Sequence, residues 1–353
     1  MKKFRLALVI ISLGLVLGIG IIFFAQSQER ELMREEFLMD TLVSISTYGT
    51  DTDFLQEATQ KAFLEIRRIA DLTNRFPLPS ITAAALSDVI RINEMAGIKP
   101  VVVDEDVFKM LQLAQEYNRL TEGAFDVTIG PVMDLWGFGR EKQKVPTASE
   151  LQKALALVDS RKLILDQKAH SAFLNKKGMA LDLGAVAKGY AVEKAAQVLE
   201  KEGVEKALIN AGGNIRVLGK KEKWKPWKIG IQDPRTPSAL MGILSLEDEA
   251  VVTSGDYNRT IQIAGKTYHH LLSSQTGYPV GYNISVTVVT RDAAQADLLS
   301  TALFLLEPQQ ALEFAAKLNK VEVVLVTADK KILCSPGLRG KIELRPGEEY
   351  SYD

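Results

Sequence analysis

An acidic residue, two glycines and a lysine lie close together in the segment LDLGAVAKGYA, residues 181–191. A nucleoside-triphosphate loop needs the pattern GxxxxGK[ST], but here Lys188 precedes Gly189 and no hydroxyl residue follows. The dinucleotide pattern GxGxxG is absent as well, both here and in NAGGNIRVLG. The remaining interpretation is a strand that ends at Asp182, followed by a helix whose first turn carries Lys188. The free amides at the start of such a helix attract anions, which favours an anion-binding site. In the alternative interpretation, Asp182 only caps the helix and the Lys188 side chain is solvated.

Asp297 and Thr301 form a second candidate pair, because they are four residues apart in the predicted helix RDAAQADLLSTALFLL. This spacing places both side-chain oxygens on one face of the helix, beside the core. Hard oxygen ligands of this kind suit Mg²⁺ or Ca²⁺, and Mg²⁺ commonly takes one or two carboxylates together with phosphate oxygens of a substrate. In the alternative, Thr301 bonds to the carbonyl of residue 297 and Asp297 lies exposed near the helix start.

The three histidines are His170, His269 and His270. The last two are adjacent in a predicted strand, so their side chains point to opposite faces and at most one can join a given site. The sequence has no HExxH motif and a single cysteine, Cys334, which excludes an internal disulfide and the usual zinc-ligand spacings. A Ser-His-Asp triad stays possible by residue count, but the GxSxG motif is absent.

The hydrophobic pattern predicts the elements that must position these residues. Apolar residues recur every three to four positions in segments that we expect to be helices, at 53–73, 106–119, 149–158, 293–306 and 308–318. Alternating or β-branched segments predict strands at 35–49, 161–166, 170–183, 205–213, 214–219, 227–233, 242–255, 259–272, 283–290 and 322–335. Because helices occur in blocks and strands are joined by short turns, the sequence predicts an α+β fold with a mostly antiparallel sheet.

The first residues differ from the rest of the chain. Three basic side chains among the first five residues precede an uncharged run from Leu6 to Ala25, which is long enough to cross a bilayer as a helix. We expect residues 1–27 to be a retained signal anchor, with a cleaved signal peptide as the alternative. The basic end then stays in the cytoplasm. The remaining chain lies on the extracytoplasmic side of the cell membrane, or is secreted if the signal is cleaved.

Composition limits the domains and the partners. The chain has 353 residues, of which 46% are hydrophobic, and this is enough for one large core. Its 43 basic and 44 acidic residues give a formal net charge of -1, so no overall field attracts nucleic acid and partners must be recognised by sites. We expect a juxtamembrane linker at 28–36, one domain at 37–345 and a short tail at 346–353.

A series of motifs, in order along the predicted domain, resembles the ApbE family, the FAD:protein FMN transferases. The motifs are FLMDTLVSI, SDVIRIN, GAFDVTIGPVMDLWGFG, LDLGAVAKGYAVE, ALINAGGNIRVLG, VVTSGDYNR, HLLSSQTGYP and SVTVVTRDAAQADLLSTAL. Their order is more specific than any single glycine motif. The resemblance implies a T-fold-like α+β architecture. It also implies a Mg²⁺-dependent reaction in which FAD and a threonine or serine hydroxyl of an acceptor protein give FMN-protein and AMP.

The resemblance also implies roles for individual residues. The FAD site would contain Met39, Asn93, Ala124, Phe125, Asp126, Asp182, Lys188, Gly212, Gly213 and His270. The metal ligands would be Asp297, Thr301 and the backbone carbonyl of Ala185. The diphosphate must lose negative charge before an alcohol oxygen attacks the phosphorus next to riboflavin, and Mg²⁺ with Lys188 can supply this. By residue type, the group that takes the acceptor proton is Asp182, Asp256 or His270.

Three segments depart from the family pattern. Asp40 replaces the glycine of the common MGT, residues 74–76 (NRF) replace a Ser-x-Tyr, and residues 273–275 (SSQ) replace an acid, a proline and a base. Lys188 and the metal pair are retained, so we interpret the chain as a transferase. Mg²⁺-dependent FAD pyrophosphatase activity and non-catalytic FAD binding or storage are the alternatives. The acceptors would resemble redox proteins with FMN-binding domains, such as subunits of ion-translocating quinone reductases or Rnf-like complexes.

Overall fold

The computed structural model describes residues 29–76, 86–222, 224–345 and 347–352. The predicted signal anchor at 1–27 therefore lies outside the described residues. Within the part of the chain that is described, no helix is both long enough and apolar enough to span a membrane.

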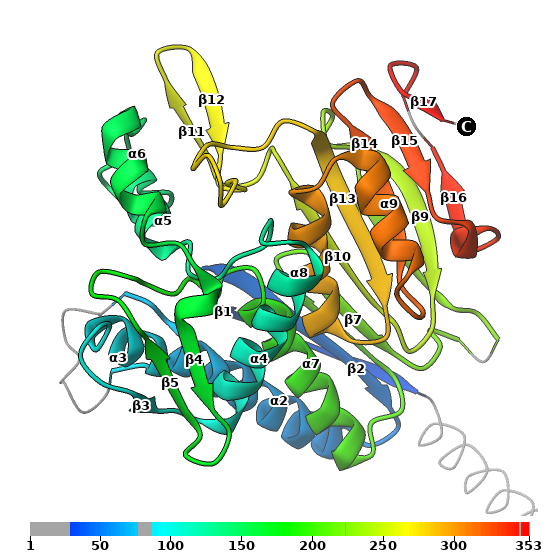
Figure 1. The fold of residues 1–353 in the computed structure, drawn as a ribbon. Coiled ribbons are helices and arrows are strands. Elements are labelled where there is room, and N and C mark those ends of the chain that lie inside the picture. Colours follow the sequence, from blue (N-terminus) through cyan, green and yellow to red (C-terminus); the bar gives the residue numbers. More distant parts are fainter. Residues whose placement is uncertain (1–28, 77–85, 223, 346, 353) are drawn as a thin grey trace, which may run out of the picture.

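A nine-stranded sheet forms the centre of the molecule, in the order β1-β2-β6-β7-β10-β13-β14-β15-β17 (Figure 1). Neighbouring strands are antiparallel, except that β15 and β17 are parallel. The strands are β1 (Arg30–Leu38), β2 (Thr41–Gly49), β6 (Ala207–Ala211), β7 (Asn214–Leu218), β10 (Ala250–Gly255), β13 (Asn283–Thr290), β14 (Glu322–Thr327), β15 (Lys331–Cys334) and β17 (Ser351–Tyr352). All residues of β13 are buried, so both faces of the sheet must be covered at this strand.

Helices cover one face of this sheet, and a small sheet covers the other (Figure 1). The helices are α2 (Thr52–Thr73), α7 (Ala187–Glu202), α8 (Ala293–Phe304) and α9 (Pro308–Ala316). The small sheet consists of β8 (Trp227–Gln232), β9 (Leu240–Leu246) and β16 (Ile342–Leu344). Each interface is an apolar cluster: Phe63 of α2 packs with Ile45 of β2 on one side, and Trp227 packs with Val217 on the other. Helices α7 and α8, which carry site residues, thus belong to a layer that is packed against the sheet.

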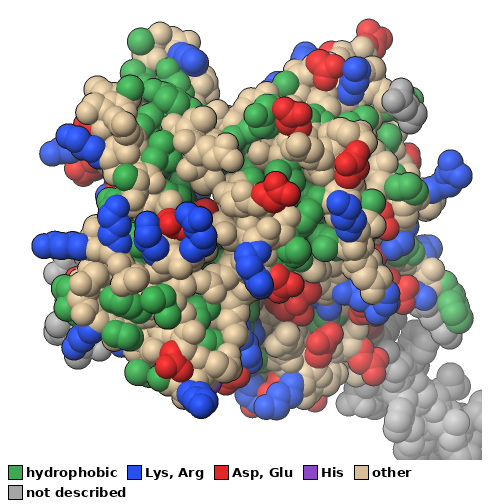
Figure 2. All heavy atoms as spheres, viewed as in Figure 1, with side chains coloured by type: hydrophobic (Ala, Val, Ile, Leu, Met, Phe, Trp, Pro, Cys, Tyr) green, Lys and Arg blue, Asp and Glu red, His purple; other side chains and the backbone are tan. Residues whose placement is uncertain are grey.

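The remaining elements form a part of the molecule that lies beside the helix layer (Figure 1). They are α3 (Asp88–Glu94), β3 (Val101–Val102), α4 (Glu105–Leu120), α5 (Gly130–Trp136), α6 (Ala148–Leu155), β4 (Leu163–Asp166), β5 (Ser171–Leu174), and the hairpin β11 (Thr260–Ile263) and β12 (Lys266–His269). Trp136 joins α5 to the hairpin, because it packs in an apolar cluster with Ile261 and the centroid of its ring lies 5.2 Å from that of Tyr268. Its indole Nε1 also donates to the carbonyl of Gly277 (2.8 Å), in the turn that follows the hairpin. Figure 2 shows a hollow between the part that carries α6 and the part that carries β15, and charged side chains of both signs are spread over the face around it.

The predicted α+β class with a mostly antiparallel sheet is confirmed, and each helix predicted from periodicity is present, with both ends within three residues of the predicted positions. The short helices α3 and α5 were not predicted, because seven residues contain fewer than two turns of periodic pattern. The prediction of a linker at 28–36 is wrong, because β1 begins at Arg30 and pairs along its whole length with β2. The prediction of a tail at 346–353 is also wrong in part, because Ser351 and Tyr352 pair with β15.

The turn between β1 and β2 carries backbone strain at the position where the family has glycine. Met39 and Asp40 have φ values of 52° and 60°, which is the left-handed region that favours glycine. We expect Asp40→Gly to raise the free energy of unfolding by about 0.5–1 kcal/mol, measured by urea denaturation. Asp40→Ala keeps the Cβ atom and is the matched control, for which we expect no gain. Equal stabilisation by both variants would show that strain at this residue is not the cause.

Candidate active site

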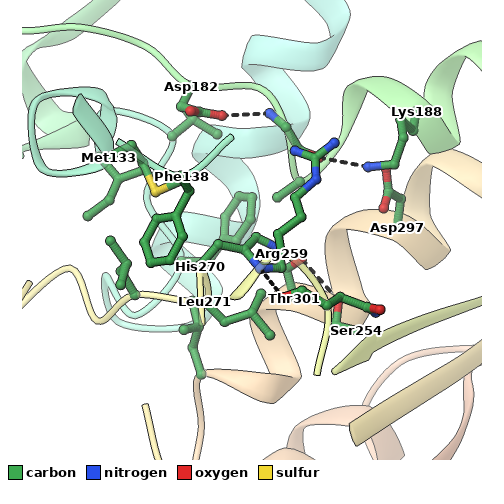
Figure 3. A pocket seen from close by; sticks show the side chains of 18 of the residues that line it. Met133, Phe138, Asp182, Lys188, Ser254, Arg259, His270, Leu271, Asp297 and Thr301 are labelled. Atoms are coloured by element: carbon green, nitrogen blue, oxygen red, sulfur yellow. Dashed lines mark hydrogen bonds between the residues drawn. The ribbon is translucent and has the colours of Figure 1, made fainter. Parts of the chain in front are cut away.

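A pocket of about 340 Å³ lies where α7, α8, β10 and the loops around α5 and β12 meet (Figure 3). Its lining contains most of the residues expected at the site: Ala124, Phe125, Asp126, Asp182, Ala185, Lys188, Gly212, His270, Asp297 and Thr301. These residues come from segments far apart in the sequence. The fold therefore brings the predicted flavin-nucleotide contacts and the predicted metal ligands into one cavity.

Met39, Asn93 and Gly213 were expected at the site but do not line the pocket. Asn93 instead holds the chain before Asp182, because its side chain accepts from the Leu181 amide (2.7 Å) and donates to the Leu181 carbonyl (3.2 Å). Met39 packs against the main core, next to the strained turn. Asn93 therefore positions a pocket residue and does not itself reach the cavity.

Asp126 lines the pocket, but hydrogen bonds within the protein occupy its carboxylate. Oδ1 accepts from the amide (2.8 Å) and the hydroxyl (2.7 Å) of Thr128, and Oδ2 accepts from the amide of Ser160 (3.1 Å). Burial raises the pKa of Asp126, and these hydrogen bonds oppose the rise. The carboxylate thus fixes the loop that carries Ala124 and Phe125.

Asp297, the carboxylate of the predicted metal pair, is buried between two helices, whereas Thr301 is half-buried. Asp297 of α8 is 5% exposed, and its Oδ2 accepts from the backbone N–H of Gly189 in α7 (2.8 Å). A Cβ atom at residue 189 would lie only 2.2 Å from the carbonyl oxygen of Ala293, so only glycine allows this approach. The exposed position considered for Asp297 is therefore wrong.

The carbonyl of Ala185 is available because of this same contact. In a regular helix the N–H of Gly189 would donate to the carbonyl four residues earlier, but here it donates to Asp297. Among the described residues, no backbone N–H donates to the Ala185 carbonyl. Ala185 thus lines the pocket, and its carbonyl lacks the usual helical partner.

Thr301 completes the oxygen cluster. Its hydroxyl lies 3.4 Å from the hydroxyl of Ser254 in β10, and the hydroxyl of Ser300 donates to the carbonyl of Asp297 (2.8 Å). Ser300, and not Thr301, thus makes the local bond that was the alternative role for Thr301. The Thr301 hydroxyl remains on the pocket face of α8.

These donors fit a magnesium ion. Burial raises the pKa of Asp297, although nearby Lys188 and the Gly189 N–H lower it, so the carboxylate is only partly neutralised by the protein. A carboxylate, a hydroxyl and a free carbonyl are hard oxygen donors of the type that Mg²⁺ prefers. Within the described ranges, no cluster of three or more histidine, cysteine or acidic side chains offers another metal site.

Lys188 lies in the first turn of α7, as the sequence predicted, and points into the pocket beside Asp297 (Figure 3). The residue at the helix cap is Val186, which makes no side-chain capping bond. The alternative in which Asp182 caps this helix is therefore wrong. The N–H groups of Ala187, Gly189 and Tyr190 already have partners within the protein, so at this helix start the ammonium group of Lys188 is what suits an anionic ligand.

Asp182 forms an ion pair that the sequence did not indicate. Arg75 donates from Nη1 to Asp182 Oδ2 (2.5 Å) and from Nη2 to Asp134 (3.0 Å), and the Gly184 N–H donates to Asp182 Oδ1 (2.9 Å). Burial alone would raise the pKa of Asp182, but Arg75 and the Gly184 N–H hold it below the usual range. The partners are 107 residues apart, so no local pattern could reveal them. The carboxylate is ionised and fixed.

Arg259 is a further pocket residue that the sequence analysis missed. It belongs to the segment TSGDYNR, which contributes Ser254, Asn258 and Arg259 to the lining. The available signal was a polar, glycine-bearing segment, and such segments are most often simple turns. With Arg75, Arg140 and Lys188 it gives the pocket four cationic side chains. Of these, Lys188 and Arg259 form no salt bridge among the described residues, which suits an anionic phosphate ligand.

His270, and not His269, lines the pocket, as expected for adjacent strand residues whose side chains point to opposite faces. His270 Nδ1 lies 3.1 Å from the carbonyl of Asn258. Since a carbonyl only accepts, Nδ1 carries the proton and Nε2 has the free lone pair. Burial, with Arg259 and Lys188 nearby, lowers the pKa of His270 to about 3, so the ring is neutral near pH 7.

Asp256, the other residue considered as a proton acceptor, does not line the pocket. Both of its oxygens accept from Arg235, each at 2.7 Å. Both carboxylate oxygens are therefore occupied by the guanidinium group. Of the three candidates, His270 is thus the one with an atom free to accept a proton.

One end of the pocket is apolar. Met133, Phe138 and Leu271 line it (Figure 3), and the Phe138 ring meets the His270 ring edge to face with centroids 6.4 Å apart. Phe138 also stacks on Trp136 at 5.6 Å. A flat aromatic ligand can pack at this end, while a charged group lies near Lys188 and Asp297.

The lowered pKa of His270 gives a testable pH dependence of stability. Since this pKa is about 3 in the folded protein against an ordinary value of 6.5, the unfolded chain binds the proton more readily. The contribution of neutral His270 to the free energy of unfolding is therefore fully present above the ordinary pKa of 6.5. This contribution is lost as the pH falls toward the pKa of the folded protein. We expect His270→Gln to lose less stability than the wild type between about pH 7 and about pH 5, measured by urea unfolding. Equal losses would contradict this.

Comparisons with known proteins agree with this geometry. The model of the ApbE family matches residues 39–325. The chain is 34% identical over 313 residues to the FAD:protein FMN transferase of Klebsiella pneumoniae (strain 342), covering 88% of this chain and 93% of that protein. It is 36% identical over 251 residues to the FAD:protein FMN transferase of Haemophilus influenzae, covering 69% and 72%.

The fold is similar to solved structures as well. The ApbE protein of Thermotoga maritima aligns with a TM-score of 0.80 and 30% identity, over 89% of this chain and 99% of that one. The flavinyl transferase ApbE of Pseudomonas stutzeri aligns with a TM-score of 0.76 and 25% identity, over 89% and 97%. Since the family match, the relatives and the structures all span most of the chain, this protein belongs to the ApbE family.

Proposed function

We propose that this protein transfers the FMN moiety of FAD to a threonine or serine hydroxyl of an acceptor protein, with Mg²⁺ as cofactor and AMP as the leaving group. One observation carries the proposal: Asp297, Thr301 and the free Ala185 carbonyl lie beside Lys188 in a single pocket. The two relatives compared above are named FAD:protein FMN transferase, which supports the choice of substrate.

The reaction is a phosphoryl transfer. The acceptor hydroxyl oxygen attacks the phosphorus that carries riboflavin, the bond from this phosphorus to the bridging oxygen breaks, and AMP leaves with that oxygen. The hydroxyl proton is released to a base. Mg²⁺ bound by Asp297, Thr301 and the Ala185 carbonyl would supply charge neutralisation at the diphosphate. Lys188 attracts the diphosphate and stabilises its negative charge from the first turn of α7.

We assign proton acceptance to Nε2 of His270. Its Nδ1 donates to the Asn258 carbonyl, which leaves the Nε2 lone pair free to accept the proton. Asp182 is ionised by Arg75 and serves instead to hold that arginine at the pocket. The apolar end with Met133, Phe138 and Leu271 would pack against the flavin ring system.

We further propose that the enzyme works outside the cytoplasm, tethered to the cell membrane by residues 1–27. The basic start and the uncharged run up to Ala25 support this location. Its acceptors would be exported redox proteins with FMN-binding domains, of the quinone-reductase or Rnf-like type. The intact mass of the protein recovered from membranes tests the tether: a mass that lacks residues 1–27 means that the signal is cleaved and the protein is not anchored.

One assay separates the proposal from its alternatives. The full chain in detergent is incubated with FAD, Mg²⁺ and an FMN-binding domain, and flavin on the acceptor and AMP in solution are then followed. Acceptor-bound FMN with an equal amount of AMP is the expected result. AMP with free FMN would mean a pyrophosphatase, and unchanged bound FAD would mean a binding or storage protein; either would overturn the transferase.

A further inference from the structure

A second pocket, of about 700 Å³, adjoins the active site. Ala124, Ser274 and Leu305 line both cavities, so they form the wall that the two share. The rest of its lining comes from the turn at residues 273–282, the end of α4, and the segment from the end of α8 through α9. The proposed reaction gives no role to the residues that line only this second pocket.

The shared wall is fixed by hydrogen bonds. The Ser274 hydroxyl donates to the carbonyl of Gly123 (2.7 Å), which joins the two loops that separate the cavities. The turn is closed by Ser273, whose hydroxyl accepts from the amide of Gln275 (3.1 Å) and whose carbonyl accepts from the amide of Gly277 (2.8 Å). The second pocket is therefore preformed, as binding sites usually are.

Helix α8 leads directly from the metal ligands to this pocket. Asp297, Thr301 and Leu305 are spaced by four residues, all three line the active site, and Leu305 also lines the second pocket. A spacing of four residues is about 6 Å along a helix. A chain lying in the second pocket would thus reach the oxygen cluster at Thr301 within one or two residues.

The charges of the two pockets differ. The active-site lining contains five aspartates and four basic residues, Arg75, Arg140, Lys188 and Arg259. Arg75 and Arg140 are paired with Asp134 or Asp182. Lys188 and Arg259 form no salt bridge among the described residues, so these two cations are left to attract the diphosphate of FAD. The charged residues that line the second pocket are Glu122, Glu307, Glu313 and Lys317. Their net negative charge repels a diphosphate and attracts basic side chains. The second pocket is therefore unsuited to FAD and suited to a neutral or basic polypeptide.

The second pocket also exposes apolar side chains that can anchor a polypeptide. Tyr282 is 45% exposed and Leu120 is 48% exposed, and both lie in the lining together with Phe314. Exposed aromatic and aliphatic side chains around a preformed concave surface are typical of protein–protein contacts. The acidic groups supply the polar part of the same surface.

We propose that this second pocket binds the hydroxyl-bearing segment of the acceptor protein and that this segment carries a lysine or arginine near its nucleophile. The proposal rests on the proposed function and names the surface that selects its acceptor. The segment enters over Glu313 and Tyr282, passes the wall at Ser274, and presents its hydroxyl beside Thr301. The acceptor and FAD thus approach the reacting phosphorus from two separate cavities.

The test compares Glu313→Lys with Glu94→Lys in the full chain. Glu94 is an exposed glutamate at the end of α3 that lines neither pocket. Glu94→Lys therefore changes the net charge of the protein by the same amount as Glu313→Lys, but away from both pockets. We expect Glu313→Lys to raise both the Kd and the KM for an FMN-binding acceptor domain about fivefold or more, with the Kd for FAD unchanged. Glu94→Lys should leave all three values unchanged. Tyr282→Ala, which does not change charge, should weaken acceptor binding in the same way.

The outcomes separate this proposal from the one on which it rests. If the wild type transfers FMN but both second-pocket variants bind the acceptor normally, the docking proposal is overturned and the transferase remains. If Glu313→Lys weakens FAD binding and not acceptor binding, the second pocket belongs to FAD and the proposal is also overturned. A wild type that transfers no FMN to any acceptor would overturn both.

Discussion

Replacing Asp297 with asparagine is expected to lower Mg²⁺-dependent AMP release at least about 100-fold. The asparagine keeps the shape of the side chain and an oxygen for the Gly189 N–H, but it removes the negative charge that would bind the cation. The measurement is the initial rate of AMP release at a series of Mg²⁺ concentrations. Unchanged activity at low Mg²⁺ would overturn the metal assignment.

The same variant separates function from folding. Because the pKa of Asp297 is raised, the folded protein disfavours the ionised carboxylate, and a neutral side chain of the same shape should not lower stability. We expect the free energy of unfolding of Asp297→Asn near pH 7 to equal or exceed that of the wild type. Asp292→Asn is the matched control, since it lies at the start of the same helix and asparagine can keep its capping bond to Gln295. This control should retain full activity.

Gly189→Ala is the second substitution with a large expected effect. In an unhindered helix, alanine in place of glycine is stabilising by about 1 kcal/mol. At this position the added Cβ would lie 2.2 Å from the Ala293 oxygen and 2.4 Å from the Cβ of Asp297, so α7 and α8 must separate. We expect a loss of about 2–3 kcal/mol in the free energy of unfolding, together with lost activity, because Asp297 moves.

Urea denaturation and AMP release measure the two effects of Gly189→Ala. Gly281→Ala is the control for stability, because an added Cβ there meets nothing within 4 Å and the backbone is not in the left-handed region. Its free energy of unfolding should change little. A Gly189→Ala variant that is more stable than the wild type would contradict the close helix contact.

The sequence predicted those parts of the site that depend on local periodicity. Asp297 and Thr301 could be paired because a four-residue spacing on an apolar helix defines one face. The adjacency of His269 and His270 likewise required that only one of them enter the pocket. Such inferences need no knowledge of which segments meet in space.

Other parts could not be derived from residue patterns. Ala185 contributes a carbonyl that is free only because Gly189 donates to Asp297 across a helix contact, and the resemblance to the family was the only pointer to it. The Arg75–Asp182 pair joins residues that only the tertiary fold brings together. In β1, charged side chains occupy even the half-buried positions Arg34 and Glu36, which hid the alternation typical of a strand.

The central claim is that an acceptor oxygen attacks the flavin-side phosphorus of FAD in this pocket. The most direct test uses FAD labelled with ³²P at that phosphorus, together with Mg²⁺, the full chain and an acceptor domain. We predict that the label becomes covalently bound to the acceptor while an equal amount of unlabelled AMP is released. Label recovered only in free FMN, with none on the acceptor, would contradict the account.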